Sequence, residues 1–392
     1  MAAVVGATTK YSKCQYAWAS VRKSGDNLQI HDGKPGPGAV AWGSFESEIH
    51  FSGYENNDLT KIGVHLQMKQ LSGLSDIFEN KTLNVSNEYL NVTKALYFNL
   101  DGDLIGLVGV VSKNSYNSID RAPTCSALIK VVGENEDILV GHNTWFVYRS
   151  MLRIEKRYAF PWHYTSKSIT ETSLENADGS LWNLVKPDSA PLTWVRGMVA
   201  TRLATNGSQW VSIFGRLNSG TYNNQWMVLD YKLFTSGKAI AKNTLWILEQ
   251  MPNLTKSEDL SNYLQKQRYW ASYNVAYNNY THDPVSRCNC TQKYNPVSAI
   301  SARFDLLSPS LSTGLPGVKQ KAVGGTDMKL TNYAMFKKLE FVAINGPTYT
   351  TDGSVPPFQW STSGFKHQEH DGHPDKWTFG PTHHHWDTCP IH

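Results

Sequence analysis

The sequence has no long apolar run and comparatively few charged residues. Its longest apolar stretch, Leu104–Val111, is much shorter than the roughly 20 residues that a membrane-spanning helix needs, so we expect no integral membrane segment. Charged residues make up 18% of the 392 positions and the net charge is only +4, without long lysine or arginine blocks. We therefore expect no nucleic-acid partner. The 40% hydrophobic and 12% aromatic content predicts a globular chain with a sizeable core.

Signals for export are also sparse. The first residues, Met1–Ala7, lack the charged segment and the full-length apolar segment of a signal peptide. Asn-x-Ser/Thr tripeptides are little more frequent than the roughly five expected by chance in a chain so rich in Asn, Ser and Thr. The candidate glycosylation sites are Asn80, Asn84, Asn91, Asn206, Asn253 and Asn279, with a seventh tripeptide at Asn289 that overlaps a cysteine pair.

Cysteine is scarce and odd in number. The five are Cys14, Cys125, Cys288, Cys290 and Cys389. An odd count leaves at least one thiol outside any pair of bridges, which is the arithmetic that points to a reactive cysteine. The alternative, in which all five are ordinary buried thiols, is the more common situation.

A strand-like hairpin begins at Cys125. The run from Cys125 to Val132 predicts one strand, Gly133–Asp137 is typical of a turn, and Ile138–His142 predicts the second strand. The preceding segment, Lys113–Thr124, is polar with few apolar residues and predicts an exposed loop. Cys125 is thus expected at the first residue of a buried hairpin, directly behind a loop that is open to cleavage.

Further periodic segments predict helices flanked by strands. We expect a helix over Leu192–Leu203, a second over Gln209–Leu217 with Ser208 as its N-cap, and helical periodicity over Trp145–Tyr158. Other strands are expected at Gln15–Arg22, Asn27–His31, Trp226–Phe234 and Asn243–Glu249. Helices with hairpins on either side favour a layered sandwich built from antiparallel sheets.

Cys125 has the chemistry of a nucleophile if the Thr124–Cys125 bond is broken. The new α-amine would titrate near about pH 8 and could act as the general base for the thiol of the same residue. Acyl transfer would also need hydrogen-bond donors for the developing oxyanion, which asparagine side chains and backbone N–H groups can supply. Composition alone favours the alternative, a cysteine that only packs in the core.

Several long, ordered blocks change that balance. They are Thr124–Lys130, His142–Trp145, Met151–Ile154, Asn218–Met227, Tyr269–Asn274, Ala299–Leu306 and Pro356–Ser361. These blocks resemble the phospholipase B-like family, the lysosomal N-terminal nucleophile hydrolases related to the lamina ancestor protein. The resemblance runs discontinuously from about Leu104 to Phe379 and more thinly over Ala39–Ser44.

This resemblance implies an α+β fold, an αββα sandwich with antiparallel sheets between helix layers. It implies a precursor that cleaves itself between Thr124 and Cys125, so that residues 1–124 remain associated with the catalytic segment 125–392 in one domain. The implied activity is cleavage of an amide or ester bond in a lipid-like small-molecule substrate, without a cofactor. The implied location is lysosomal or secreted.

The resemblance also assigns roles to individual residues. Cys125 would be the nucleophile and Asn274 the oxyanion donor. His142 and Trp145 would line the pocket beside the thiol, and Thr172 or Ser173 would contribute a polar wall. Relatives carry a longer segment after the block that ends at Asn274, including an active-site arginine that has no match here. This departure supports the alternative, a catalytically inactive member that serves as a binding or structural glycoprotein.

Two further features remain open. Cys288 and Cys290 resemble a close-spaced cysteine pair of the family, and both a local disulfide and pairing with Cys14 or Cys389 are compatible with the sequence. The tail from His367 onward is rich in histidine, a common metal ligand. Because Gly372, Pro374 and Pro381 deny it regular spacing, we expect a solvated loop and no metal.

Overall fold

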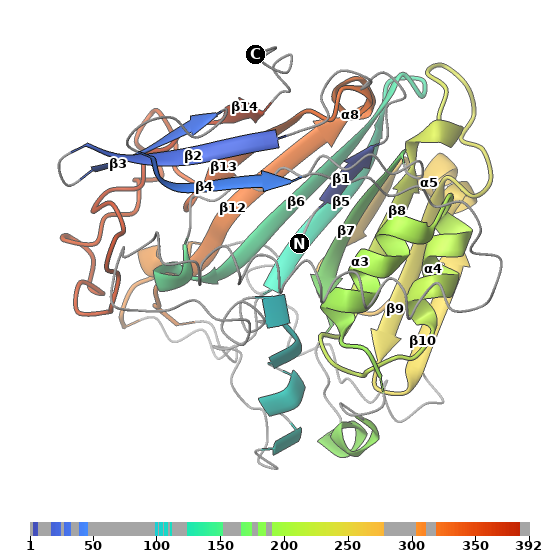
Figure 1. Cartoon of the computed structure of the whole chain (residues 1–392), viewed down its shortest axis with the longest axis horizontal. Coiled ribbons are helices and arrows are strands. Elements are labelled where there is room, and N and C mark those ends of the chain that lie inside the picture. Colours follow the sequence, from blue (N-terminus) through green and yellow to red (C-terminus); the bar gives the residue numbers. More distant parts are fainter. Residues whose placement is uncertain are drawn as a thin grey trace.

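The structure is a computed structural model that describes fourteen strands and the helices around them. It describes the backbone of residues 3–6, 17–24, 27–32 and 39–45, and then residues 99–111 except 101, 105 and 109. It further describes residues 124–151, 166–174, 179–185, 190–277, 303–310 and 319–384. Figure 1 shows the strands gathered into sheets, with helices along one side.

Two large antiparallel sheets form the frame of the molecule. The five-stranded sheet has the order β1-β7-β8-β9-β10, with β1 (Ala3–Gly6), β7 (Ser166–Ser173), β8 (Asn224–Asp230), β9 (Leu245–Met251) and β10 (Leu254–Asp259). The six-stranded sheet has the order β11-β5-β6-β12-β13-β14, with β11 (Tyr269–Ser272), β5 (Thr124–Val132), β6 (Asp137–Val147), β12 (Val323–Asn332), β13 (Phe341–Asn345) and β14 (Thr382–His384).

A smaller sheet comes from the N-terminal part of the chain. It has the order β3-β2-β4, with β2 (Ala17–Ser24), β3 (Asn27–Asp32) and β4 (Ala39–Phe45). β2 and β3 form a hairpin, and they overlap the two strands expected at Gln15–Arg22 and Asn27–His31. By contrast, β1 leaves this part of the chain and pairs with β7, so the first residues complete the edge of the five-stranded sheet.

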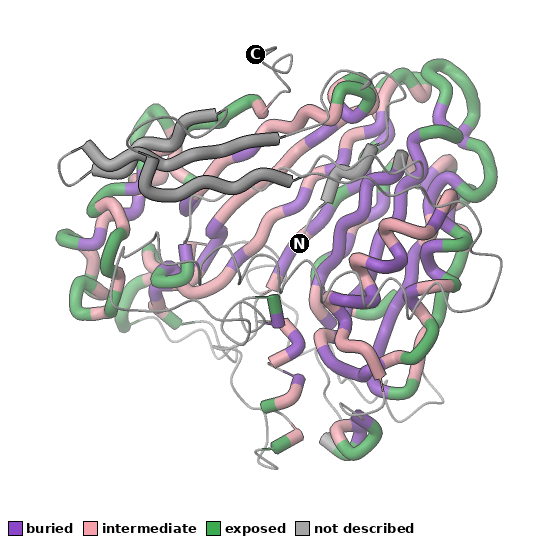
Figure 2. Tube along the Cα trace, viewed as in Figure 1, coloured by how far each residue is buried: buried purple, intermediate pink, exposed green. Residues whose placement is uncertain are grey.

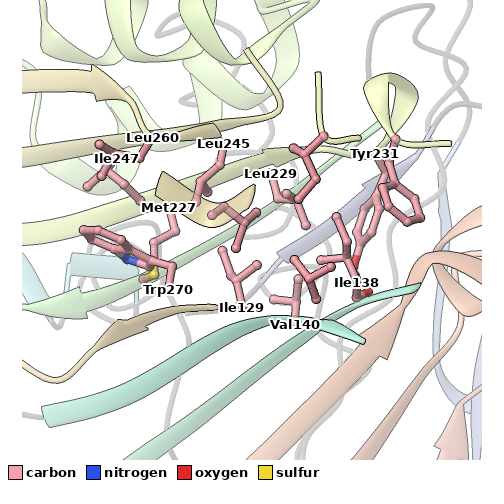
Figure 3. Close-up of a cluster of buried hydrophobic side chains, with 14 of the residues drawn as sticks. Ile129, Ile138, Val140, Met227, Leu229, Tyr231, Leu245, Ile247, Leu260 and Trp270 are labelled. Carbon is pink, nitrogen blue, oxygen red and sulfur yellow. Dashed lines mark hydrogen bonds between the residues drawn. The ribbon is translucent and has the colours of Figure 1, made fainter. Parts of the chain in front are cut away.

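The main core lies between the two large sheets. Alternate residues of β5, from Cys125 to Val131, are buried because successive side chains of a strand point to opposite faces. Figure 3 shows apolar side chains of the β5–β6 hairpin meeting those of β8 and β9. The labelled members from these four strands are Ile129, Ile138, Val140, Met227, Leu229, Leu245 and Ile247. This layer makes the pair of sheets a sandwich.

Helices cover the outer face of the five-stranded sheet. They are α3 (Thr193–Leu203) and α4 (Gly207–Gly215), which lie beside β8 and β9 (Figures 1 and 2). Buried side chains of these helices pack against side chains of the two strands. Trp210, Phe214 and Trp226 form a mutual ring cluster in this layer, with centroids 4.8 to 5.4 Å apart. Two short helices, α5 (Ser261–Gln267) and α8 (Tyr333–Lys337), follow β10 and β12.

The predicted fold class is confirmed, because helices pack on antiparallel sheets in an α+β sandwich. None of the helices in the described part of the chain is both long and apolar enough to cross a membrane. Several sequence-based boundaries need correction. Residues 145–147 continue β6 rather than starting a helix, Thr124 belongs to β5 rather than to the preceding loop, and β8 ends at Asp230.

Candidate active site

Cys125 and His142 lie on the same inward face of the β5–β6 hairpin. Cys125 is paired with Thr144, and His142 is paired with Ala127. Because paired residues of antiparallel strands share a face, the register brings the thiol and the imidazole together. Both side chains are buried, with 3% and 2% of their surface exposed. The sequence-based pairing of these two residues is therefore present in the fold.

Glu171 from β7 completes a group of three. The Sγ of Cys125, a ring nitrogen of His142 and a carboxylate oxygen of Glu171 all lie within 4.8 Å of one another. The Glu171 carbonyl oxygen accepts a hydrogen bond from His142 Nε2 at 3.0 Å, and its Oε1 accepts one from the Tyr222 hydroxyl at 2.9 Å. Sequence reasoning missed Glu171. Its only signal in the sequence was an acidic residue between two threonines.

The hydrogen bond to Glu171 fixes the tautomer of His142. A carbonyl oxygen can only accept, so Nε2 carries the proton. Burial, together with the positive charge of Lys329, lowers the pKa of His142 well below its usual value, so the imidazole is neutral. Nδ1 therefore presents a lone pair, and no donor among the described residues reaches it. The site thus holds a buried proton acceptor, on a ring that has one nitrogen within 4.8 Å of the Cys125 Sγ.

The thiol itself is weakly acidic in the intact chain. Burial, reinforced by the negative charge of Glu171, raises the pKa of Cys125 to about 12, while Lys329 opposes the shift. A thiol with such a pKa stays protonated near neutral pH, and the thiol is a poorer nucleophile than the thiolate. Chemistry at Cys125 therefore needs a neighbouring base or a change in its surroundings.

A lysine supplies positive charge beside the thiol. Lys329 lies on β12 opposite His142 and donates to Asp327 Oδ1 at 2.5 Å and to Thr144 Oγ1 at 3.3 Å. Since Thr144 is paired with Cys125, this ion pair lies next to the thiol. This cation comes from β12, far along the chain from Asn274.

Asn274 follows β11 with a left-handed backbone, at φ 67°. Ser272 is paired with Ala127, so the register continued by two residues reaches the level of Cys125. The Asn274 Nδ2 donates to Ser173 O at 2.7 Å and to Ser173 Oγ at 3.0 Å, which commits both amide hydrogens. Its Oδ1 is buried, and no donor among the described residues reaches it. In the intact chain Asn274 thus presents an acceptor.

Thr172 and Ser173 form a polar wall between the two sheets. The hydroxyl of Thr172 is 2.6 Å from that of Ser272, and both side chains are buried. This contact joins β7 to β11. Ser173 holds Asn274 as described above, so both predicted residues have defined polar contacts near the start of the hairpin.

Trp145 lies apart from the thiol. It is three residues beyond His142 on β6, and strand alternation turns it to the opposite face of the sheet. There it stacks on Phe304, with ring centroids 6.5 Å apart. The structure therefore does not bring Trp145 together with Cys125. Thr124, on the other side of the bond predicted to be cleaved, donates from its hydroxyl to Trp145 O at 3.2 Å.

The candidate modification sites have mixed positions. Asn253 is exposed in the β9–β10 turn, and Asn206 is half-buried as the N-cap of α4. The remaining candidates for glycosylation and for a disulfide lie outside the described residues. They are Asn80, Asn84, Asn91, Asn279, Cys288 and Cys290.

The histidine-rich tail is only partly the solvated loop that was expected. His370 stacks on Trp360 with ring centroids 4.3 Å apart, and His384 belongs to β14. Both are packed against neighbouring aromatic rings. Across the described residues, the group of three side chains with metal-ligand spacing is Cys125, His142 and Glu171, away from this tail.

Comparison of the sequence with known proteins identifies the family of this chain. The sequence profile described as Phospholipase B matches residues 54–170, 164–279 and 275–384. Phospholipase B-like 2 of Rattus norvegicus is 33% identical over 83% of this chain and 70% of its own length. The Homo sapiens protein of the same name is also 33% identical, over 83% and 69%. Phospholipase B-like 1 of Caenorhabditis elegans is 31% identical over 82% and 71%. The chain belongs to the phospholipase B family.

Proposed function

We propose that the chain is a self-processing N-terminal nucleophile hydrolase that cleaves an amide or ester bond of a lipid-like substrate, in the lysosome or after secretion. The observation that carries this proposal is the buried pair of Cys125, the second residue of β5, and neutral His142 on β6. The names of the relatives support the hydrolase class and a lipid-like substrate. No cofactor takes part in the proposed reaction.

The first step is cleavage of the chain itself. The Cys125 thiol gives its proton to His142 Nδ1, and its sulfur attacks the carbonyl carbon of Thr124. The peptide nitrogen of Cys125 leaves as an amine after taking a proton, so that a thioester replaces the peptide bond. Water then hydrolyses the thioester, releasing the Thr124 carboxylate and the free thiol. The positive charge of Lys329 favours the thiolate that this step requires.

Turnover of a substrate uses the amine that cleavage creates. The α-amine of Cys125 accepts the thiol proton, and the sulfur forms an acyl-enzyme that water later hydrolyses. The acceptor Oδ1 of Asn274 suits a hydrogen bond from this new amine. Asn274 serves as an oxyanion donor only when Nδ2 releases one of its bonds to Ser173. The predicted donor role therefore depends on a local rearrangement after cleavage.

The test is incubation of the purified chain at mildly acidic pH, followed by gel electrophoresis and N-terminal sequencing. We expect two fragments, one of which begins at Cys125. The matched control is Cys125→Ala, which keeps the small buried side chain and removes the sulfur. Persistence of one intact wild-type chain, or equal cleavage of the Cys125→Ala chain, contradicts the proposal.

A second candidate is a binding or structural glycoprotein without catalysis. It is favoured by the weakly acidic, buried thiol and by the commitment of both Asn274 amide hydrogens. A thiol-directed acylating probe distinguishes the two functions after incubation at acidic pH. Selective labelling of Cys125 supports the hydrolase, whereas labelling no faster than that of the denatured chain supports the glycoprotein.

A further inference from the structure

A buried histidine with one occupied and one open ring nitrogen is the feature that remains unexplained by chain packing. His142 donates from Nε2 to the Glu171 carbonyl oxygen at 3.0 Å. Its Nδ1 is buried without a donor among the described residues. Metal-binding histidines have this arrangement, because a backbone carbonyl that holds one ring N–H orients the lone pair of the other nitrogen toward the ion.

Two further side chains with metal-ligand atoms lie near this imidazole. The Cys125 sulfur and a Glu171 carboxylate oxygen lie within 4.8 Å of each other and of a His142 ring nitrogen. A tetrahedral zinc ion with bonds of about 2.0–2.3 Å separates its ligand atoms by about 3.3–3.6 Å. Side-chain movements of about 1 Å would therefore close the group around one ion. Tyr222 already orients the carboxylate through its bond to Oε1.

The kinds of ligand select the metal. Thiolate and imidazole exclude Mg²⁺ and Ca²⁺, which prefer oxygen ligands, and a sulfur, nitrogen and oxygen set is typical of zinc. The charges also balance, because a thiolate and a carboxylate together neutralise Zn²⁺ while the imidazole stays neutral. A neutral complex is far less costly to bury than any of its ions alone.

We propose that Cys125, His142 and Glu171 bind one Zn²⁺ ion in the intact chain, and that this ion blocks the chemistry of the thiol. A bond from zinc to Sγ replaces the S–H bond, the proton leaves to solvent, and no oxidation state changes. Zinc here is a reversible inhibitor of the nucleophile, not a cofactor. The site requires only the folded chain and is independent of whether the chain cleaves itself.

The first experiment measures zinc binding by competition with a chromophoric chelator, on intact metal-free chain at neutral pH. We expect one tightly bound Zn²⁺ per chain. Glu171→Gln and His142→Asn should each weaken the affinity by more than about 10-fold. The matched control is the double variant His383→Gln, His384→Gln in the tail, which should bind zinc as the wild type does. Unchanged binding in Glu171→Gln and His142→Asn, or loss only in the tail variant, overturns the proposal.

The second experiment asks whether the sulfur is a ligand. Co²⁺ in place of zinc should give a thiolate-to-cobalt charge-transfer absorption in the wild type that is absent in Cys125→Ala. Zn²⁺ should also slow alkylation of Cys125 by iodoacetamide, and a chelator should restore the rate. Absence of the band, or alkylation at the same rate with and without zinc, contradicts the site. A chain that binds zinc in this way but never cleaves itself contradicts only the proposed hydrolase.

Discussion

Asn274 combines two requirements in one residue. Its φ of 67° lies in the left-handed region, which glycine and asparagine tolerate best, and its carboxamide joins the end of β11 to Ser173. Glycine can adopt the same left-handed backbone conformation and lacks the side-chain carboxamide. Asn274→Gly therefore separates the conformational role of this residue from its chemical role.

For Asn274→Gly we expect the fold to persist. Hydrolysis of a chromogenic thiol-reactive ester by the cleaved protein should slow by about 10²–10³-fold, because this is the typical effect of losing one polar group that stabilises a transition state. Steady-state kinetics measure the rate, and circular dichroism checks the fold. A matched change outside the site is Asn253→Gly, also at a positive φ, in the exposed β9–β10 turn. Equal rates for Asn274→Gly and the wild type would remove Asn274 from the catalytic group.

Lys167 offers a pH-dependent test of the sandwich. Its side chain is fully buried and its Nζ donates to Ala204 O at 2.5 Å. Burial lowers the pKa of Lys167 to about 8, against 10.5 for an exposed lysine. Between these values the unfolded chain binds a proton that the folded chain has lost, so this group makes stability rise with pH.

We therefore expect Lys167→Met to remove that rise. Relative to this variant, the wild type should gain up to about 3 kcal/mol in free energy of unfolding between about pH 8 and 10.5. Urea denaturation at several pH values measures the difference. A constant difference between the two proteins over this range would show that Lys167 titrates normally in the folded chain.

At the scale of single residues, the sequence predicted Cys125 and His142 as parts of the site but missed Glu171 and Lys329. Cys125 and His142 lie on adjacent strands of one hairpin, so local pattern and register bring them together. Glu171 and Lys329 reach the same place from β7 and β12. Their approach depends on how distant strands pair and pack, which no local pattern encodes.

The N-terminus of α4 illustrates the element scale. The predicted N-cap was Ser208, but the helix begins at Gly207, and the Asn206 side chain accepts from Gln209 N–H at 2.9 Å. Both residues are good caps. A two-residue ambiguity of this kind is typical of helix ends, because neighbouring polar residues can each satisfy the first free N–H groups.

Asn206→Ala should thus lower the free energy of unfolding by about 1 kcal/mol, whereas Ser208→Ala, one position into the helix, should change it by less than about 0.5 kcal/mol. Urea denaturation of both variants provides the comparison. The opposite ranking would restore Ser208 as the cap. Because Asn206 is also a candidate glycosylation site, both proteins should be expressed without glycosylation.

At the scale of the whole molecule, the segment before Cys125 is built into the fold of the segment after it. β1 pairs with β7. Asp103 accepts from the first N–H groups of α3, at Thr193 and Trp194, at 2.9 and 3.1 Å, and from the hydroxyl of Thr221. Acidic groups are favourable at such helix starts. These contacts support the prediction that residues 1–124 remain associated after cleavage.

Asp103→Ala should weaken that association. It leaves two backbone donors and a hydroxyl without their buried acceptor, which should lower the stability of the intact Cys125→Ala chain by about 2–4 kcal/mol. In a cut chain, the first fragment should separate at a lower urea concentration on size-exclusion chromatography. Asp103→Asn is the matched control, since it keeps one acceptor oxygen and should have the smaller effect. Identical behaviour of all three proteins would exclude Asp103 as an anchor.

The fold class could be predicted from the sequence, because alternating strands, two helices and the family blocks all indicate the same sandwich. The order of the strands could not. The two large sheets each draw on segments that are far apart in the chain, such as β1 beside β7 and β12 beside β6. Such pairings depend on the packing of the complete chain rather than on the pattern of any segment.

The pairing of β1 with β7 has a consequence for the thermal history of a cut molecule. After cleavage, the strands of the five-stranded sheet would belong to two separate polypeptides that had folded as one chain. If heating separated the two polypeptides, they could reassociate only through a diffusional encounter, which competes with aggregation. Persistence of the mature protein would be governed by the height of its unfolding barrier rather than by an equilibrium, and a second calorimetric scan should show little of the first transition.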